Sequence, residues 1–202
     1  MTTLDKSVPY YPVLMVLDKE VEIPEVSLAQ GYYFQRFDSG YTEDWVRLHV
    51  LLGQLESFEK GMEYFEETFA SHPEELRKQM ILIVDEQGRL AGTSSVWRGD
   101  HFGDERLRVH WVGVHPDHQK KGLARSLMLE TISLYQEMEH TAPLYLTTQT
   151  NSYVAIHLYK QLGFVPYMGE MPVNFKANAK TFKEDNEKAW QIIDQKLEEL
   201  AH

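Results

Sequence analysis

Hydrophobic residues recur along this chain with two periods, one typical of strands and one typical of helices. Aromatic and β-branched runs between turn residues predict strands, and these runs lie at 31–37, 80–85, 90–98, 107–114, 143–149 and 164–175. Apolar residues three and four apart predict amphipathic helices, which lie at 42–57, 59–70, 122–138, 151–163 and 186–200. The segment 164–175 has room for one or two strands. The resulting order, β, α, α, β, β, β, α, β, α, β, β, α, predicts a mixed α/β sheet with helices on both faces.

Two polar residues stand where helices are expected to begin. Thr42 opens the helical pattern of 42–57, and Asn151 opens that of 151–163. Threonine and asparagine side chains accept hydrogen bonds from the first free N–H groups of a helix. We therefore expect both residues to act as N-caps.

The composition narrows the class of protein. The chain has 202 residues, a formal net charge of −11 and no cysteine. This length suits one compact domain or two very small ones, and we expect a single domain over residues 1–202. The acidic balance argues against a nucleic-acid binder, which needs a basic face. Without cysteine there is no disulfide and no thiolate metal site. The sequence shows no signal peptide and no apolar run of about 20 residues, so we expect a cytoplasmic protein with no membrane partner.

One turn gathers positive charge in this acidic chain. After the strand 107–114 the sequence reads HPDHQKKGLARS, where Pro116 ends the ladder and Gly122 allows a tight turn into the next helix. The first N–H groups of a helix lack partners and carry the positive end of its dipole. A phosphate or pyrophosphate suits such a turn. The alternative is a solvated turn that carries lysines, because the segment matches neither a Walker A loop nor G-x-G-x-x-G.

Two motifs resemble those of the GNAT superfamily, the acyl-CoA-dependent N-acetyltransferases. The stretch VGVHPDHQKKGLA (112–124) resembles the family's V-x-V followed by Q/R-x-x-G-x-G/A. About thirty residues on, LYLTTQTNSYVAIHLYKQLGFVPY (144–167) resembles a strand followed by N-x-x-A-x-x-x-Y-K/E-x-x-G-F. Together the motifs cover 107–167. The resemblance implies a mostly antiparallel GNAT-like sheet, with helices 42–70 bordering the acceptor site.

The resemblance also implies which residues bind acetyl-CoA, the co-substrate. The backbone of Val112 and Val114 would pair with the pantetheine arm, and Asn151 would bond to pantetheine or to the site backbone. The turn would hold the pyrophosphate, chiefly through the amides of Lys120, Gly122, Ala124 and Arg125. The full set of turn residues is Gln119, Lys120, Lys121, Gly122, Leu123, Ala124 and Arg125.

Acetyl transfer to an amine needs a base, a donor to the acyl oxygen and an acid for the thiolate. The resemblance points to Tyr159 as the acid and to the Val112 N–H as the oxygen donor, beside Gly113 and its bulge-compatible backbone. No carboxylate lies between Arg106 and Val114. His110, expected to face the same way as Val112 and Val114, is the candidate base because histidine titrates near neutrality. One branch of the family has two such histidines, but Arg108 takes the first place here. A water-mediated base and a purely structural histidine are the alternatives.

The remaining expectations concern partners. His115, Asp117 and His118 lie in the cofactor turn and lack the arrangement of a metal site, so we expect no metal. The acceptor would be a small-molecule or peptide amine, and an acidic face near 56–67 would suit a cationic one. A homodimer is compatible with the terminal helix 186–200. Two rival functions are a non-catalytic acyl-CoA sensor or interaction domain and a nucleotide-phosphate binder.

Overall fold

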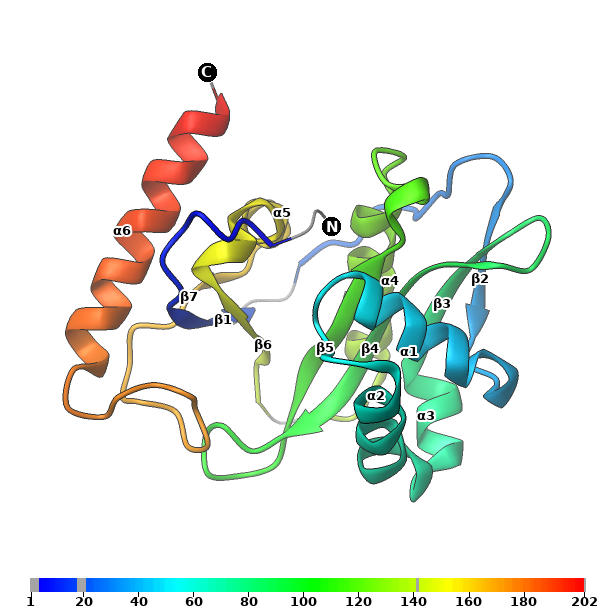
Figure 1. The fold of residues 1–202 in the computed structure, drawn as a ribbon, viewed down its shortest axis with the longest axis horizontal. Coiled ribbons are helices and arrows are strands. Elements are labelled where there is room, and N and C mark those ends of the chain that lie inside the picture. Colours follow the sequence, from blue (N-terminus) through cyan, green and yellow to red (C-terminus); the bar gives the residue numbers. More distant parts are fainter. Residues whose placement is uncertain (1–3, 18–20, 141, 202) are drawn as a thin grey trace. The chain divides into compact units, whose positions relative to one another are not determined.

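The fold is built on one seven-stranded sheet. A computed structural model describes residues 4–17, 21–140 and 142–201. The strand order is β2-β3-β4-β5-β6-β1-β7 (Figure 1). The pairs β2–β3, β3–β4, β1–β6 and β1–β7 are antiparallel, and β5–β6 is parallel. The strands are β1 Pro12–Leu17, β2 Tyr32–Arg36, β3 Met80–Asp85, β4 Leu90–Gly99, β5 Arg106–Val114, β6 Leu144–Gln149 and β7 Val165–Pro166.

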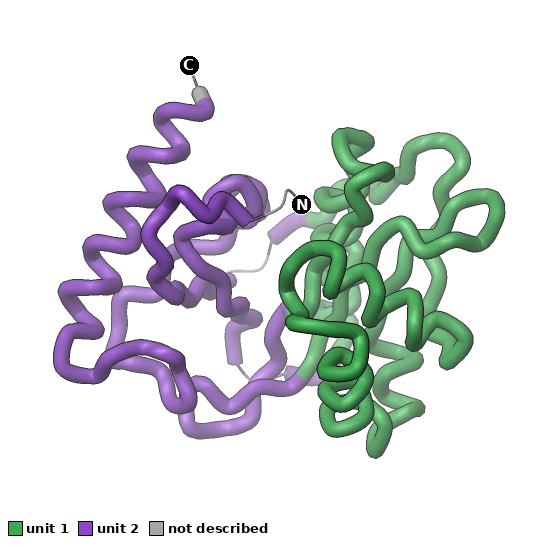
Figure 2. The backbone as a smooth tube through the Cα atoms, in the orientation of Figure 1, with its two compact units in different colours: residues 1, 23–97, 110–138 green, residues 2–22, 98–109, 139–202 purple. Residues whose placement is uncertain are grey.

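Within the described residues, six α-helices accompany the sheet, together with short 3-10 and π-helical turns. The expected mixed, mostly antiparallel sheet is confirmed. The helices are α1 Thr42–Leu51, α2 Phe58–Phe65, α3 Pro73–Gln79, α4 Leu123–Glu137, α5 Tyr153–Gln161 and α6 Phe182–Ala201. The described residues group into two compact units (Figure 2). The first unit contains 23–97 and 110–138, and the second contains the other described residues.

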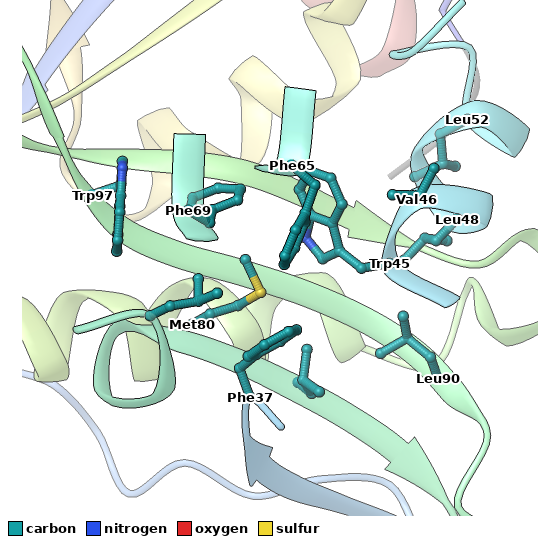
Figure 3. Close-up of a cluster of buried hydrophobic side chains, with 12 residues drawn as sticks. Phe37, Trp45, Val46, Leu48, Leu52, Phe65, Phe69, Met80, Leu90 and Trp97 are labelled. Carbon is teal, nitrogen blue, oxygen red and sulfur yellow. The ribbon is translucent and has the colours of Figure 1, made fainter. Parts of the chain in front are cut away.

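The first unit buries a hydrophobic core on each face of β3. Met80 and Leu82 pack into an aromatic cluster with α1, α2 and the π-helical turn Glu66–Ala70. Figure 3 shows this cluster. Ile81 and Ile83, which alternate with them, pack against α4. This alternation confirms the expectation of helices on both faces of the sheet.

The helix α1 begins at residue 42 as expected, but its N-cap differs and it ends before residue 57. The 3-10 turn Ser39–Tyr41 runs directly into the helix, and Asp38 caps that turn by accepting the Gly40 N–H at 2.9 Å. Thr42 is therefore the first helical residue and not the N-cap, which is Tyr41 without a side-chain hydrogen bond. The helix ends at Leu51 because Gly53 adopts a left-handed φ of +71°.

The helix α3 was not expected from the sequence. It begins with proline and two acidic residues and ends with basic residues, which is the usual distribution of charge on a helix. Leu76 is its one buried residue, so it carries no apolar period. The apolar periodicity of the sequence therefore did not indicate this helix, although the proline and the charges typical of helix ends were present.

The strand β1 was also unexpected, and it adds a strand between β6 and β7 in the second unit. Its six residues pair with β6 from Pro12 opposite Gln149 to Leu17 opposite Leu144. Met15 and Val16 also pair with β7. The closing segment 164–175 contributes only the two-residue β7, which pairs with β1. Helix α6 is longer than expected, since it begins at Phe182 and not near residue 186.

Candidate active site

A bulge in β5 sets the direction of the side chains at the candidate site. Trp111 has a φ of +52°, a left-handed value that non-glycine residues rarely adopt. His110 and Trp111 both contact Tyr64 of α2, so they lie on the same face. Val114, by contrast, packs with the α4 cluster. The expectation that His110 faces the same way as Val112 and Val114 is therefore wrong, because the bulge interrupts the alternation of the strand.

Tyr64 joins the two side chains at the bulge. Its hydroxyl accepts the Trp111 Nε1–H at 3.0 Å and lies 3.2 Å from His110 Nε2. The Tyr64 and Trp111 rings meet edge to face, with centroids 5.1 Å apart. Phe69 packs beside both Tyr64 and His110. Sequence reasoning missed Tyr64, because no local pattern tells which α2 residue meets β5.

A buried histidine lies behind the same bulge. His49 of α1 has Trp45 on one side, with ring centroids 4.3 Å apart, and Trp111 at 4.9 Å. Burial lowers the pKa of His49 to about 4, although its hydrogen bond to Gln54 opposes this shift. Its Nδ1 is 2.5 Å from Gln54 Oε1, so the neutral ring carries its proton on Nδ1. Gln54 Nε2 in turn donates to the Val112 carbonyl at 3.4 Å.

The turn after β5 has the conformation of an anion cradle. Lys120 and Gly122 have φ values of +61° and +77°, and a Cβ added to Gly122 would meet nothing within 4 Å. Leu123 and Ala124 open α4, so their N–H groups have no intrahelical acceptor. The Arg125 N–H donates to the Gly122 carbonyl at 3.0 Å. Its amide is thus engaged, while its side chain is exposed.

Three side chains of the turn have partners that the sequence did not predict. Lys121 Nζ donates to the Tyr32 hydroxyl at 2.6 Å, and His118 Nδ1 lies 2.8 Å from the same oxygen. Burial, with help from His115 and Lys121, lowers the pKa of His118. Gln119 Nε2 donates to the Val114 carbonyl at 3.1 Å. Tyr32 of β2 therefore fixes one side of the turn.

The other two expected site residues lie in the second unit. Tyr159 is buried beside Phe164, and burial raises its pKa, so the phenol keeps its proton. Asn151 lies in the 3-10 turn Thr150–Ser152, and Ser152 is the N-cap of α5, so the expected capping by Asn151 is wrong.

Asn151 instead holds the segment before β1. Its Nδ2 donates to the carbonyls of Asp5 and Val8 at 2.7 and 2.6 Å. The chain also places Asn151 four residues before Ala155, where the quoted motif has three. Ser152 thus stands at the motif's asparagine position, and the Nδ2 group of Asn151 is occupied within the second unit.

Two further features bear on the kind of site. In the part of the chain that the structure describes, no group of three or more His, Asp or Glu residues is arranged to hold a metal ion. Within the same residues, no helix is long and apolar enough to cross a membrane.

Known proteins resemble this chain in sequence. A family model described as "Acetyltransferase (GNAT) family" matches residues 42–164. The mycothiol acetyltransferase of Pseudarthrobacter chlorophenolicus is 28% identical over 166 residues, or 72% of this chain and 46% of that protein. The L-amino acid N-acyltransferase MnaT of Escherichia coli K12 is 34% identical over 87 residues, or 42% of this chain and 49% of that protein. This chain therefore spans about half the length of these two relatives.

Solved structures resemble it in fold. The GCN5-related N-acetyltransferase from Sphaerobacter thermophilus has a TM-score of 0.60 at 19% identity, with 78% of this chain and 50% of that chain covered. A tandem GNAT protein from the clavulanic acid biosynthesis pathway has a TM-score of 0.58 at 18% identity, with 81% and 52% covered. At this identity the likeness establishes the fold.

Proposed function

The chain belongs to the GNAT acetyltransferase family, and from this premise we propose that it transfers an acetyl group from acetyl-CoA directly to a primary amine. The observation that carries the proposal is the bulged strand followed by the open, glycine-containing turn. The bulge and the turn lie on one stretch of chain, so one ligand can contact both. Relatives are named for acceptors as different as an amino acid and spermidine, so the proposal extends only to a small-molecule or peptide amine.

The turn fits the pyrophosphate of acetyl-CoA. The open space at Gly122 lets an anion approach the backbone, and the N–H groups of Leu123 and Ala124, which lack an intrahelical acceptor, would donate to it. Lys120 and Arg125 are exposed beside them. Bound acetyl-CoA would supply the activated thioester carbonyl. The backbone of Val112 and Val114 would pair with its pantetheine arm once the glutamine side chains on their carbonyls move aside.

Three groups of the chain would carry the chemistry. The Val112 N–H follows the bulge and would donate a hydrogen bond to the acyl oxygen. His110 would take the proton of the acceptor amine. Tyr159, kept protonated by burial, would donate to the departing sulfur.

The first test is ligand-dependent thermal stability with acetyl-CoA, CoA, ATP and NADH at equal concentration. A ligand at about 100 times its Kd adds about 2.7 kcal/mol of stability, which is several degrees of Tm. A shift with acetyl-CoA and CoA alone is expected. An equal shift with ATP and NADH would point to a general nucleotide-phosphate binder, and no shift with either CoA species would contradict the proposal.

The second test separates an enzyme from an acyl-CoA sensor. Tyr159→Phe should slow acetyl transfer to an amine panel by about 10²-fold or more and leave CoA affinity nearly unchanged. Tyr153→Phe, on the same helix with its hydroxyl 3.3 Å from Asp5 Oδ2, is the matched control and should keep wild-type turnover. Tight CoA binding with no transfer by the wild type would favour the sensor.

A further inference from the structure

We propose that the Tyr64 hydroxyl relays the proton of the acceptor amine to His110. This inference rests on the proposed function, in which His110 is the base. It adds a residue that no motif marks, since α2 lies outside both GNAT-like segments of the sequence.

The hydrogen bonds at Tyr64 allow its proton to point at His110. An indole nitrogen only donates, so the 3.0 Å contact makes the Tyr64 oxygen an acceptor from Trp111. The phenol has one proton of its own, and His110 Nε2 lies 3.2 Å away. Donation of that proton to Nε2 satisfies both contacts and leaves one lone pair on the Tyr64 oxygen. That lone pair can accept the N–H of an amine.

The burial of His110 favours a relay over direct contact. Its Nδ1 atom is buried, so a proton from an acceptor would reach the ring at Nε2. Nε2 already has Tyr64 as its partner. The tyrosine itself is half-buried, and its ring is held between Phe69 and Trp111. An amine that meets the Tyr64 hydroxyl would therefore pass its proton to the imidazole through that oxygen.

The proposed step moves two protons and one positive charge. The ammonium N–H bond of the acceptor breaks, its electron pair stays on nitrogen, and the proton forms a new O–H bond on Tyr64. The original Tyr64 O–H bond breaks, and that proton forms the Nε2–H bond of His110. The products are a neutral amine, a neutral tyrosine and an imidazolium, so atoms and charge balance.

The kinetic test compares two tyrosines of the same aromatic cluster. Tyr64→Phe keeps the ring and should lower kcat by about 10-fold to 10²-fold with CoA affinity unchanged. Tyr41→Phe is the matched control, because the Tyr41 hydroxyl donates elsewhere, to the Gly88 carbonyl at 3.0 Å. A proton inventory in mixed light and heavy water should curve for the wild type and become linear for Tyr64→Phe. Wild-type kcat in Tyr64→Phe would overturn the relay, even if His110→Gln is inactive.

A second measurement needs no acceptor and no turnover. In protein made with ¹⁵N-labelled histidine, NMR of the neutral His110 ring should show the proton on Nδ1 in the wild type. Nε2 should be the acceptor. Tyr64→Phe should move the Nε2 resonance, and Tyr41→Phe should not. A proton on Nε2 in the wild type would overturn the relay. Failure of the proposed function would appear differently: His110 would carry its proton on Nδ1 as expected, but the protein would bind no CoA.

Discussion

A left-handed backbone at Trp111 determines what the middle of β5 presents to the helices. Such a conformation costs about 1–2 kcal/mol for a residue with a side chain. The contacts of the indole with Trp45, His49 and Tyr64 offset this cost. The strained residue therefore lies where the proposed chemistry occurs. Its conformation interrupts the alternation of side-chain direction between His110 and Val112.

Gly113 is needed because α1 lies close to the bulge. A Cβ added there would lie 2.6 Å from Leu52 Cδ1 and 3.2 Å from His49 Cε1. Gly113→Ala should lower the free energy of unfolding by about 1–3 kcal/mol, measured by urea denaturation. Leu52→Ala opens the same space, so the double variant should be more stable than the sum of the two single effects implies. Strict additivity would show that Leu52 is not the obstacle.

His49 should make the fold sensitive to acid. Its pKa of about 4 in the fold lies below the ordinary value of 6.5, so between these values the unfolded chain binds more protons. Its contribution is fully present above pH 6.5 and is lost as the pH falls to 4, a total of roughly 3 kcal/mol. His49→Gln should therefore give a flatter curve of unfolding free energy between pH 6.5 and 4. Identical slopes for the two proteins would contradict the burial argument.

At the scale of elements, the sequence predicted those that bury a regular apolar face. The hairpin of β3 and β4, the strand β5 and the helix α4 were expected within one or two residues. The elements α3 and β1 were not, since α3 buries one residue and the short apolar run of β1 shows its pairing only in three dimensions. The site divides in the same way. The turn and His110 follow from local motifs, whereas Tyr64, His49 and Tyr32 reach it through tertiary packing.

Asn151 should stabilise the segment before β1. Asn151→Ala removes two hydrogen bonds to the carbonyls of Asp5 and Val8, and the loss should cost about 1–3 kcal/mol. Faster amide exchange across residues 5–17 is the expected signature, with Asn178→Ala as an exposed control. If Asn151→Ala weakened CoA binding and left exchange unchanged, the residue would belong to the cofactor site instead.

At the scale of the whole molecule, the net charge has the same sign as the expected ligand, whereas the turn that would bind it is positively charged. The chain carries −11 overall, yet the turn gathers Lys120, Lys121 and Arg125. Screening limits electrostatic effects to about 10 Å at 0.1 M salt. The local cations should therefore decide the affinity for a polyanion such as CoA.

Salt should weaken the binding of CoA. Raising ionic strength from about 0.05 M to about 0.5 M should increase the Kd several-fold in calorimetric titrations, because the contacts with phosphate are screened. Acetyl-pantetheine, which lacks the nucleotide and its pyrophosphate, should bind with little salt dependence. A Kd for CoA that falls with added salt would show that the net charge of the protein dominates.

The position of β1 between β6 and β7 has a consequence for folding during synthesis. On the ribosome β1 emerges long before its partner, because the contact between Tyr11 and Thr150 joins residues 139 apart. Contacts of such separation are formed late and slow the search for the native topology. The apolar residues Val13, Leu14 and Met15 must therefore wait unpaired during synthesis. During this interval the exposed apolar strand can associate with other chains, and binding of a chaperone would prevent this.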